Sequence, residues 1–296
     1  MHIVVTGCSG HLGRVVVPHL LTSLPDCEIT GLDVQQPTYQ YEGFRYQPLN
    51  ITDPELASSL QNVDAVIHLA FVVIAAPAGH EQPDMNVLAA RNLVHCTLAN
   101  SVPLLIHLSS AAVYGPWPDT PVPVNEQTAM RPLPGFLYAQ DKVEVEQILL
   151  RAYEPVNTGK LVILRLPTIL GPHAQPYLKK MLRSPFRLAG KKAQAHSQCV
   201  HEQDVAEAIR RCVMQPVVGT YNLAAEPARS LKQWQHRAGG GYIPLPWWLA
   251  APGLAWGWHH AGGQGSAAWL QGLGSDLVLD CTALYDALDW QPQRRA

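Results

Sequence analysis

The chain has 296 residues, of which 47% are hydrophobic, and its formal net charge is −2. This length and hydrophobic content allow one large α/β domain, or a large domain with a small one, and they exclude a largely disordered chain. The small net charge gives no electrostatic reason to expect a nucleic-acid partner.

Short apolar runs alternate with stretches of helical length through the first 225 residues. The predicted strands are HIVVT (2–6), EITGLD (28–33), FRYQPL (44–49), DAVIHLA (64–70), PLLIHLS (103–109), KLVILRL (160–166) and TYNLA (220–224). Helices are predicted near residues 11–23, 53–61, 84–100, 138–153 and 203–214. Strands that are apolar on both faces and separated by helices indicate a parallel sheet covered on both sides, which is a doubly wound α/β domain.

Two stretches fall outside this alternation. Residues 115–135 are rich in proline and are predicted to form a long loop over the sheet. Seven of the eight tryptophans lie between residues 234 and 290, which predicts a small, mostly irregular second domain. Residues 238–275 carry no formal charge, but prolines interrupt the apolar run, so no transmembrane segment is predicted.

The first strand leads directly into a glycine-rich turn, VVTGCSGHLG. Gly7 permits a tight turn, Gly10 lets the backbone approach a pyrophosphate, and Gly13 lets the helix pack closely on the strand. The helix N-terminus would then direct N–H groups at the phosphates. The alternative is a tight strand–helix turn without a ligand. Asp33 ends the second strand, where a carboxylate accepts ribose hydroxyls and repels a 2′-phosphate, so NAD is favoured over NADP.

The distribution of cysteine and histidine predicts no metal site. Six cysteines lie far apart without a Cys-x-x-Cys pair, which is typical of buried thiols in a reducing cytoplasm. The adjacent His259 and His260 have no third ligand nearby. The N-terminal MHIVVTGCSG reaches a glycine too early for a signal peptide, so we expect a cytoplasmic location.

Several motifs in the same order resemble those of the extended short-chain dehydrogenases/reductases, the NAD-dependent epimerase/dehydratase family. They are TGCSGHLG (6–13), DAVIHLA (64–70), DMNVLAARNLV (84–94), LSSAAVYG (108–115), YAQDK (138–142), LRLPTILGP (164–172) and VHEQDVA (200–206). The resemblance covers about 225 residues and implies Ser110, Tyr138 and Lys142 as catalytic residues. It implies NAD as the cofactor and a homodimer as the assembly.

The predicted cofactor-binding residues are Gly7, Ser9, Gly10, His11, Leu12, Gly13, Asp33, Asn50, Ile51, Leu69, Ala70, Asn86, Tyr138, Lys142 and Pro167. We therefore expect residues 1–172 with 197–225 to form an NAD-binding Rossmann domain. Residues 173–196 with 226–296 are expected to form a small substrate or lid domain. His201 and Asp204 are expected to dock the return helix of the larger domain.

The sequence departs from the family pattern where nucleotide sugars are handled. Ala111 and Ala112 follow Ser110 in place of the Asp-Glu pair of the dehydratases, and Asn50 replaces an aspartate near the adenine. Ser197 stands where epimerases commonly carry arginine, and no arginine or lysine lies between Arg237 and Arg294. The run 179–192 is either a solvated basic face or a site for a phosphate-bearing substrate.

Tyr138 and Lys142 are spaced to lie on one face of a helix. A free phenol has a pKa of about 10, so at pH 7 only about one phenol in a thousand is ionised. An ammonium about 4 Å away could supply most of the roughly three-unit decrease in pKa that ionisation at pH 7 requires. The resemblance implies that Tyr138 exchanges a proton with a secondary alcohol while hydride passes to NAD⁺. It also implies that Lys142 binds the nicotinamide ribose and that Ser110 hydrogen-bonds the substrate oxygen.

These observations predict an NAD-dependent oxidoreductase acting on a small, weakly charged alcohol or ketone. Two alternatives remain: an NAD-dependent nucleotide-sugar 4-epimerase, and a dinucleotide-sensing protein without turnover. The uncharged segment 238–275 carries five tryptophans, which either line a substrate lid or pack the small domain against the large one.

Overall fold

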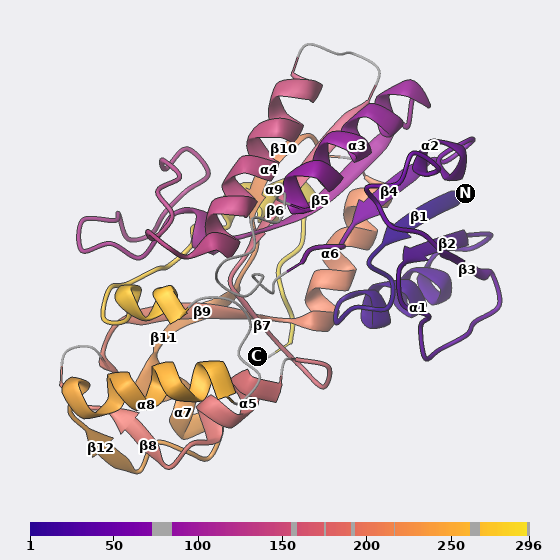
Figure 1. Cartoon of the computed structure of the whole chain (residues 1–296). Coiled ribbons are helices and arrows are strands. Elements are labelled where there is room, and N and C mark those ends of the chain that lie inside the picture. Colours follow the sequence, from indigo (N-terminus) through magenta and orange to yellow (C-terminus); the bar gives the residue numbers. More distant parts are fainter. Residues whose placement is uncertain are drawn as a thin grey trace.

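A computed structural model describes residues 1–72, 85–154, 159–174, 176–190, 193–215, 217–260 and 267–294. Its centre is a seven-stranded sheet in which every pair of neighbouring strands is parallel. In spatial order the strands are β10 (Gly219–Asn222), β6 (Lys160–Leu166), β5 (Leu104–Ser110), β4 (Ala65–His68), β1 (His2–Thr6), β2 (Glu28–Asp33) and β3 (Phe44–Pro48). This is the predicted doubly wound, Rossmann-type sheet (Figure 1).

Helices cover both faces of this sheet because its strands are apolar on both sides. One face carries α1 (Gly13–Ser23), α6 (Glu202–Met214) and α9 (Thr282–Leu288), which share a core with Ile3 and Val5. The other face carries α2 (Leu56–Ser59), α3 (Met85–Ala99) and α4 (Leu137–Tyr153), which share a core with Val4. Consecutive residues of β1 thus point into different cores, and each fully buried aliphatic side chain contributes about 1.5–3 kcal/mol.

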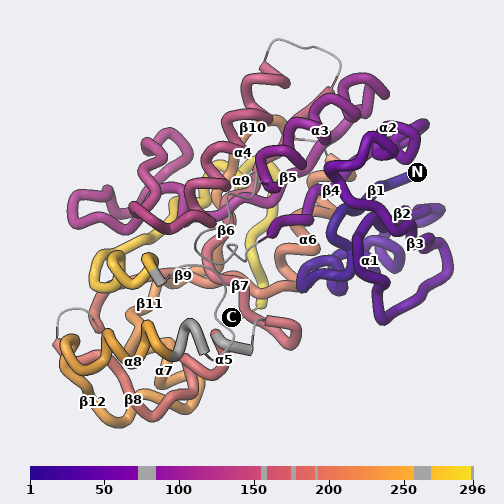
Figure 2. The backbone as a smooth tube through the Cα atoms, viewed as in Figure 1, coloured from indigo at the N-terminus to yellow at the C-terminus, as the bar shows by residue number. Residues whose placement is uncertain are grey.

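A smaller unit lies beside the sheet (Figure 2). It holds a three-stranded sheet of β11 (Ala225–Ser230), β9 (His196–His201) and β7 (Thr168–Leu170), and a two-stranded sheet of β12 (Ile243–Leu245) and β8 (Phe186–Leu188). Around them lie α5 (Pro176–Arg183), α7 (Leu231–Arg237), α8 (Trp247–His260) and the 3₁₀ helix η3 (Ala267–Gly272). Their own small core includes Leu188, Ala193 and Ala250.

The predicted strands all occur in the large sheet, with bounds within two residues of those expected. The prediction that the chain after residue 226 is mostly irregular is wrong, because α7, α8, α9 and two strands lie there. The last residues also pack differently from the prediction: Leu284 and Leu288 of α9 lie in the core of the large sheet. Because α9 packs in this core, the segment that contains it belongs to the larger unit rather than to the small one. No helix among the described residues is long and apolar enough to cross a membrane.

Candidate active site

The glycine-rich turn has the geometry that its three glycines predict. Gly7 has a φ of +72°, and a Cβ on it would lie 2.6 Å from the backbone nitrogen of Ala70. A Cβ on Gly13 would lie 2.1 Å from the carbonyl oxygen of Cys8. Any larger residue at either position would displace backbone, so the turn brings β1, β4 and the start of α1 into close contact. The residue before α1, Leu12, provides no side-chain cap, so no side chain blocks the start of this helix, although the N–H groups of Arg14 and Val15 already donate to the carbonyl oxygens of Gly10 and Leu12.

Asp33 lies beside this turn, at the carboxyl end of β2. Its Oδ2 accepts a hydrogen bond from the backbone N–H of Ser9 at 2.9 Å, and its Oδ1 accepts one from Gln35 at 3.0 Å. Each carboxylate oxygen retains a further lone pair for a ribose hydroxyl. Val34, which follows, is apolar and 66% exposed, so it offers no charge to a 2′-phosphate; the nearby Arg14 donates from Nε to the carbonyl oxygen of Ser9 at 3.1 Å.

The other predicted cofactor residues lie at the same edge of the sheet, after the ends of β3, β4 and β6. Leu69 and Ala70 donate backbone hydrogen bonds to the carbonyl and hydroxyl of Thr6. Asn50 is exposed, and its Oδ1 accepts from the N–H and hydroxyl of Thr52. Ile51 is buried, and Pro167 is half-buried between β6 and β7. The residues present therefore fit a dinucleotide along this edge.

Asn86 lies at the start of α3, but its side chain is occupied by the protein. Its amide exchanges two hydrogen bonds with the backbone of Val72 and donates one to Asp141 at 2.8 Å. Asp141 directly precedes Lys142 in α4. In this structure the Asn86 side chain therefore joins α3 to the first turns of α4, a contact that the sequence analysis did not predict.

Ser110 and Tyr138 meet at the edge of the sheet. Ser110 ends β5, where its Oγ accepts a hydrogen bond at 3.2 Å from the N–H of Ala112. Tyr138 stands in the first turn of α4, and burial raises the pKa of its phenol, an effect that a hydrogen bond with Ser110 partly opposes. The phenol therefore stays protonated at neutral pH in this structure.

Lys142 lies one turn further along α4, and its surroundings correct one expectation. Its Nζ donates to the carbonyl oxygen of Leu108 at 2.7 Å and lies 3.6 Å from the ring centroid of Phe71. Burial lowers the pKa of Lys142 to about 7. The prediction that Lys142 lowers the pKa of Tyr138 is wrong for this state, because its ammonium is directed at Leu108 and Phe71 and lies 5.9 Å from the Tyr138 ring centroid.

A buried ion pair joins α4 to β6. Glu146, one turn beyond Lys142, pairs with Arg165 of β6 at 2.7 Å, and the two side chains are 0% and 4% exposed. Glu146 also accepts a hydrogen bond from Ser109, the neighbour of Ser110. Arg165 in turn donates to the hydroxyl of Tyr114 at 2.9 Å. These groups fix the inner face of α4 relative to β5 and β6.

His11, a predicted cofactor residue, contacts a carboxylate of α6. Its Nε2 lies 2.8 Å from Oε2 of Glu202, the first residue of α6. The other oxygen of Glu202 lies 2.8 Å from Nδ1 of His173. Neither Glu202 nor His173 was singled out from the sequence, because a lone glutamate at a helix start is usually only favourable to the helix dipole.

Among the described residues no group of three or more His, Cys, Asp or Glu could hold a metal ion. The side chains of His259 and His260 lie outside the described part of the chain. His201 accepts a hydrogen bond from the N–H of Gln203 and caps α6, while Asp204 accepts from the backbone of Gln293 and Arg294. Both residues therefore dock α6, as predicted. Lys180 and Arg183 of the basic run are exposed, as on a solvated face.

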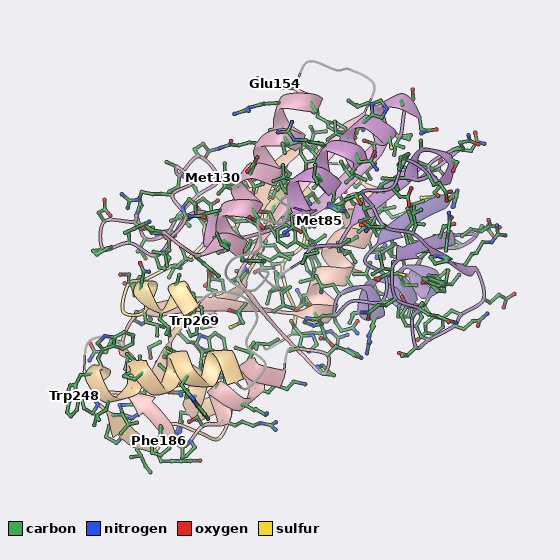
Figure 3. The ribbon with its side chains drawn as sticks, in the orientation of Figure 1. Met85, Met130, Glu154, Phe186, Trp248 and Trp269 are labelled. Carbon is green, nitrogen blue, oxygen red and sulfur yellow. The ribbon has the colours of Figure 1, made fainter. Side chains whose placement is uncertain are left out.

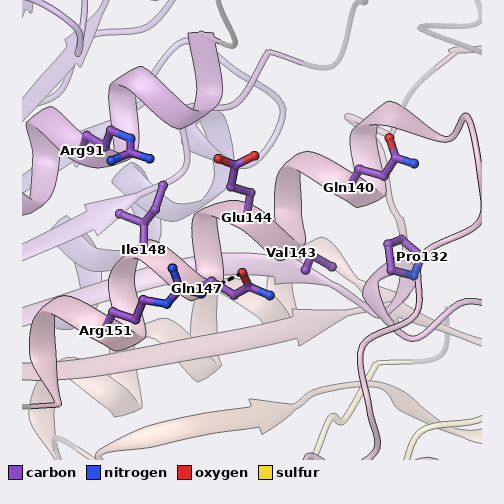
Figure 4. A pocket seen from close by; sticks show the side chains of 8 residues that line it. All are labelled: Arg91, Pro132, Gln140, Val143, Glu144, Gln147, Ile148 and Arg151. Carbon is purple, nitrogen blue, oxygen red and sulfur yellow. Dashed lines mark hydrogen bonds between the residues drawn. The ribbon is translucent and has the colours of Figure 1, made fainter.

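A groove of about 300 Å³ lies between α3 and α4, lined by Arg91, Pro132, Gln140, Val143, Glu144, Gln147, Ile148 and Arg151 (Figure 4). These side chains occupy the outer face of α4, whereas Lys142 and Glu146 are buried on its inner face. The groove is therefore separate from the predicted catalytic residues.

The chain was compared with known proteins and structures. The model of the "NAD dependent epimerase/dehydratase family" matches residues 3–224. An uncharacterized protein of Mycobacterium tuberculosis is 29% identical over 202 residues, which cover 67% of this chain and 54% of that protein. A 3 beta-hydroxysteroid dehydrogenase/Delta 5-->4-isomerase of Monkeypox virus is 28% identical over 167 residues, covering 53% of this chain and 48% of that protein.

Among solved structures, MoeE5 in complex with UDP-glucuronic acid and NAD superposes with a TM-score of 0.76 at 18% identity. The superposition covers 100% of this chain and 95% of MoeE5. This likeness shows the same fold for the whole chain. The chain spans about half the length of the curated relatives that it matches.

Proposed function

Because the chain belongs to the NAD-dependent epimerase/dehydratase family, whose cofactor is NAD, we propose that it is an oxidoreductase acting reversibly at a secondary alcohol or ketone carbon. Tyr138 is the acid and base of the reaction. The observation that carries this proposal is that the fold brings Ser110, at the end of β5, next to Tyr138, in the first turn of α4, at the edge of the sheet where the glycine-rich turn lies. The two residues are 28 positions apart in the sequence and would not meet without the fold.

Tyr138, Ser110 and Lys142 have different roles in the proposed reaction. NAD, when bound, exchanges hydride with the carbinol carbon. In the direction of reduction Tyr138 donates its phenolic proton to the substrate oxygen, and in the direction of oxidation the phenolate takes that proton back. Ser110 donates a hydrogen bond to the same oxygen as charge develops on it. The Phe71 ring lies 3.6 Å from the Nζ of Lys142 and shields this amino group from water.

The dinucleotide is held by the residues of the carboxyl edge. Gly7, Gly10 and Gly13 let the backbone approach the pyrophosphate, and the start of α1 supplies N–H groups. Asp33 accepts the adenosine ribose hydroxyls. Lys142 would reach the nicotinamide ribose by leaving the carbonyl of Leu108.

We propose a small, weakly charged alcohol or ketone as the substrate. In support, the uncharged segment 238–275 includes η3, and Gly272 of η3 lies against Pro116 and Leu133 of the loop that precedes the catalytic helix. A lid for a diphosphate would present cations there, since leaving phosphate charges unpaired in an apolar site costs several kcal/mol. One of the relatives is named a 3 beta-hydroxysteroid dehydrogenase/Delta 5-->4-isomerase.

A nucleotide-sugar 4-epimerase is the second candidate, and MoeE5, which shares the fold, was crystallised with UDP-glucuronic acid. A dinucleotide sensor is the third, and the presence of Ser110, Tyr138 and Lys142 speaks against it. Measuring NAD-linked turnover of UDP-sugars beside hydrophobic secondary alcohols separates the three. We expect turnover of the alcohols alone. Efficient epimerisation of a UDP-sugar would favour the nucleotide-sugar 4-epimerase. NAD binding without turnover of any compound in a broad panel would favour the dinucleotide sensor.

We further propose a homodimer formed through the outer faces of α3 and α4. Leu88 of α3 and Leu150 of α4 are 42% and 36% exposed on these faces, and the groove of Figure 4 lies between them. The six reduced, buried cysteines support a cytoplasmic location. Sedimentation of Leu88→Glu beside the wild-type protein tests the dimer, since a charge at the centre of that interface should leave monomers.

A further inference from the structure

Helix α8 exposes an apolar face. Its exposed positions are 248, 249, 252, 253 and 256, which form one stripe along a helix because they recur at steps of three and four residues. Trp248 is 71% exposed, Leu249 50% and Trp256 65%. The opposite face, with Trp247, Ala250 and Leu254, packs on the small core. A helix that is apolar on both faces is normally buried on both.

The apolar surface continues onto the neighbouring strands. Phe186 of β8 and Ile243 of β12 are paired in register and are 49% and 48% exposed, and the adjacent Tyr242 is 66% exposed. Figure 3 shows Trp248 and Phe186 at the outer margin of the small unit, away from the large sheet. We call the surface formed by Trp248, Leu249, Trp256, Phe186, Tyr242 and Ile243 the outer apolar face.

The unit that carries this face is strongly basic, although the whole chain is not. Residues 173–196 and 226–275 contain nine lysines and arginines and a single acidic residue, Glu226, a formal charge of +8. The rest of the chain carries −10, which gives the net charge of −2. Lys180 and Arg183 of α5 and Lys232 and Arg237 of α7 are exposed, and none of them pairs with an acidic residue in the described part of the chain.

We propose that the outer apolar face binds the surface of a lipid bilayer that contains anionic lipids. Indole and phenol rings favour the boundary between headgroups and acyl chains, and the cations of the same unit are attracted to the negative surface within a Debye length. Among residues 247–256 of α8, whose side chains the structure describes, the exposed ones offer only indole N–H groups for hydrogen bonding. A protein partner would require about one hydrogen bond per 100–200 Å² of interface, and a nucleic acid would meet no phosphate-binding side chain on residues 247–256 of this helix. The apolar stripe therefore fits lipid better than either.

Co-sedimentation of the full chain with vesicles tests this. We expect binding to vesicles of phosphatidylcholine with 30% phosphatidylglycerol, and at least tenfold weaker binding to phosphatidylcholine alone. Trp248→Ser with Leu249→Ser should weaken binding at least tenfold. The matched control is Met214→Ser with Val218→Ser, which removes two side chains that are 58% and 60% exposed on the large unit and should bind as the wild type does.

The charge is tested separately. Lys232→Gln with Arg237→Gln should weaken binding by about fivefold for each cation lost, and 0.5 M salt should abolish the difference. Arg45→Gln with Lys160→Gln, two exposed cations of the large unit, is the control. Absence of binding to both vesicle types, or equal binding of the Trp248/Leu249 variant and the wild type, would overturn the proposal. Sedimentation showing a dimer in which Trp248 is shielded from a soluble quencher would also overturn it, since a second copy would then cover the face.

Discussion

The carboxylate of Glu202 and the imidazole of His11 are hydrogen-bonded at 2.8 Å, although 191 residues separate them. This contact joins the glycine-rich turn to the first turn of α6. Burial lowers the pKa of His11, and Glu202 opposes this shift. Burial acts to raise the pKa of Glu202, but the hydrogen bonds from His173 and His11 outweigh it, so the pKa falls below its ordinary value. The carboxylate is therefore ionised at neutral pH and holds the side chains of His11 and His173 in place by hydrogen bonds.

Replacing Glu202 with alanine should lower the free energy of unfolding by about 1–3 kcal/mol, because it removes a buried carboxylate, 1% exposed, that accepts hydrogen bonds from both histidines. Since the pKa of Glu202 is lowered by folding, its contribution is present above the ordinary carboxyl pKa and is lost as the pH falls through the folded value. Urea unfolding at pH 7 and pH 4 measures this. Glu42→Ala, at an exposed position, is the control and should change stability by less than about 0.5 kcal/mol. Equal effects of the two variants at pH 7 would contradict the role of Glu202.

The ion pair between Glu146 and Arg165 predicts a larger loss. Glu146→Ala leaves a guanidinium buried without its partner and should cost about 3–5 kcal/mol. The matched control is Asp119→Ala, which breaks an ion pair to Arg131 whose side chains are 71% and 50% exposed. That pair should contribute less than about 1 kcal/mol. Denaturant midpoints of the two variants should differ clearly, and similar midpoints would mean that α4 is anchored elsewhere.

The large sheet could be predicted from the sequence because each of its strands is a short apolar run bounded by a helix. The small unit could not. β8 and β12 have three residues each, and α8 has no polar face from which a helical period could be recognised. The sequence analysis also did not predict that Glu202, His173 and Phe71 lie at the site. They reach it through tertiary contacts that no local sequence pattern encodes. The motif predicted the place of Lys142, whereas the direction of its ammonium depends on Phe71 and the carbonyl of Leu108.

Cofactor choice should depend on Asp33. Asp33→Ala with Val34→Arg removes a carboxylate that repels a 2′-phosphate and adds a guanidinium that binds one. Because Val34 is exposed beside Asp33, the arginine requires no repacking. We expect the ratio of NADP to NAD affinity to rise at least tenfold in fluorescence titrations. Tighter binding of NADP than of NAD by the wild-type protein would contradict the assigned role of Asp33.

The two directions of the reaction should respond differently to pH. Burial raises the pKa of Tyr138, so the protonated phenol that reduction requires prevails at neutral pH. Oxidation requires the phenolate, so kcat/KM for oxidation should rise with pH above neutrality while kcat/KM for reduction stays level between pH 6 and pH 8. Initial rates over pH 6–10 in both directions check this. A rate of oxidation that falls from pH 7 to pH 9 would show that the loss of charge at Lys142, whose pKa is about 7, controls the reaction instead.

The central claim is that Tyr138 transfers the proton while other residues hold the dinucleotide. Tyr138→Phe tests it most directly, since the change removes one oxygen and keeps the ring against Phe71. The measurement is single-turnover kinetics beside NAD titration, with Tyr41→Phe, a half-exposed tyrosine of the loop before β3, as the control. The account predicts a rate lower by about 10²–10⁴ in Tyr138→Phe, the usual contribution of a general acid or base, with NAD affinity within about threefold of wild type. A rate within about tenfold of wild type would contradict it.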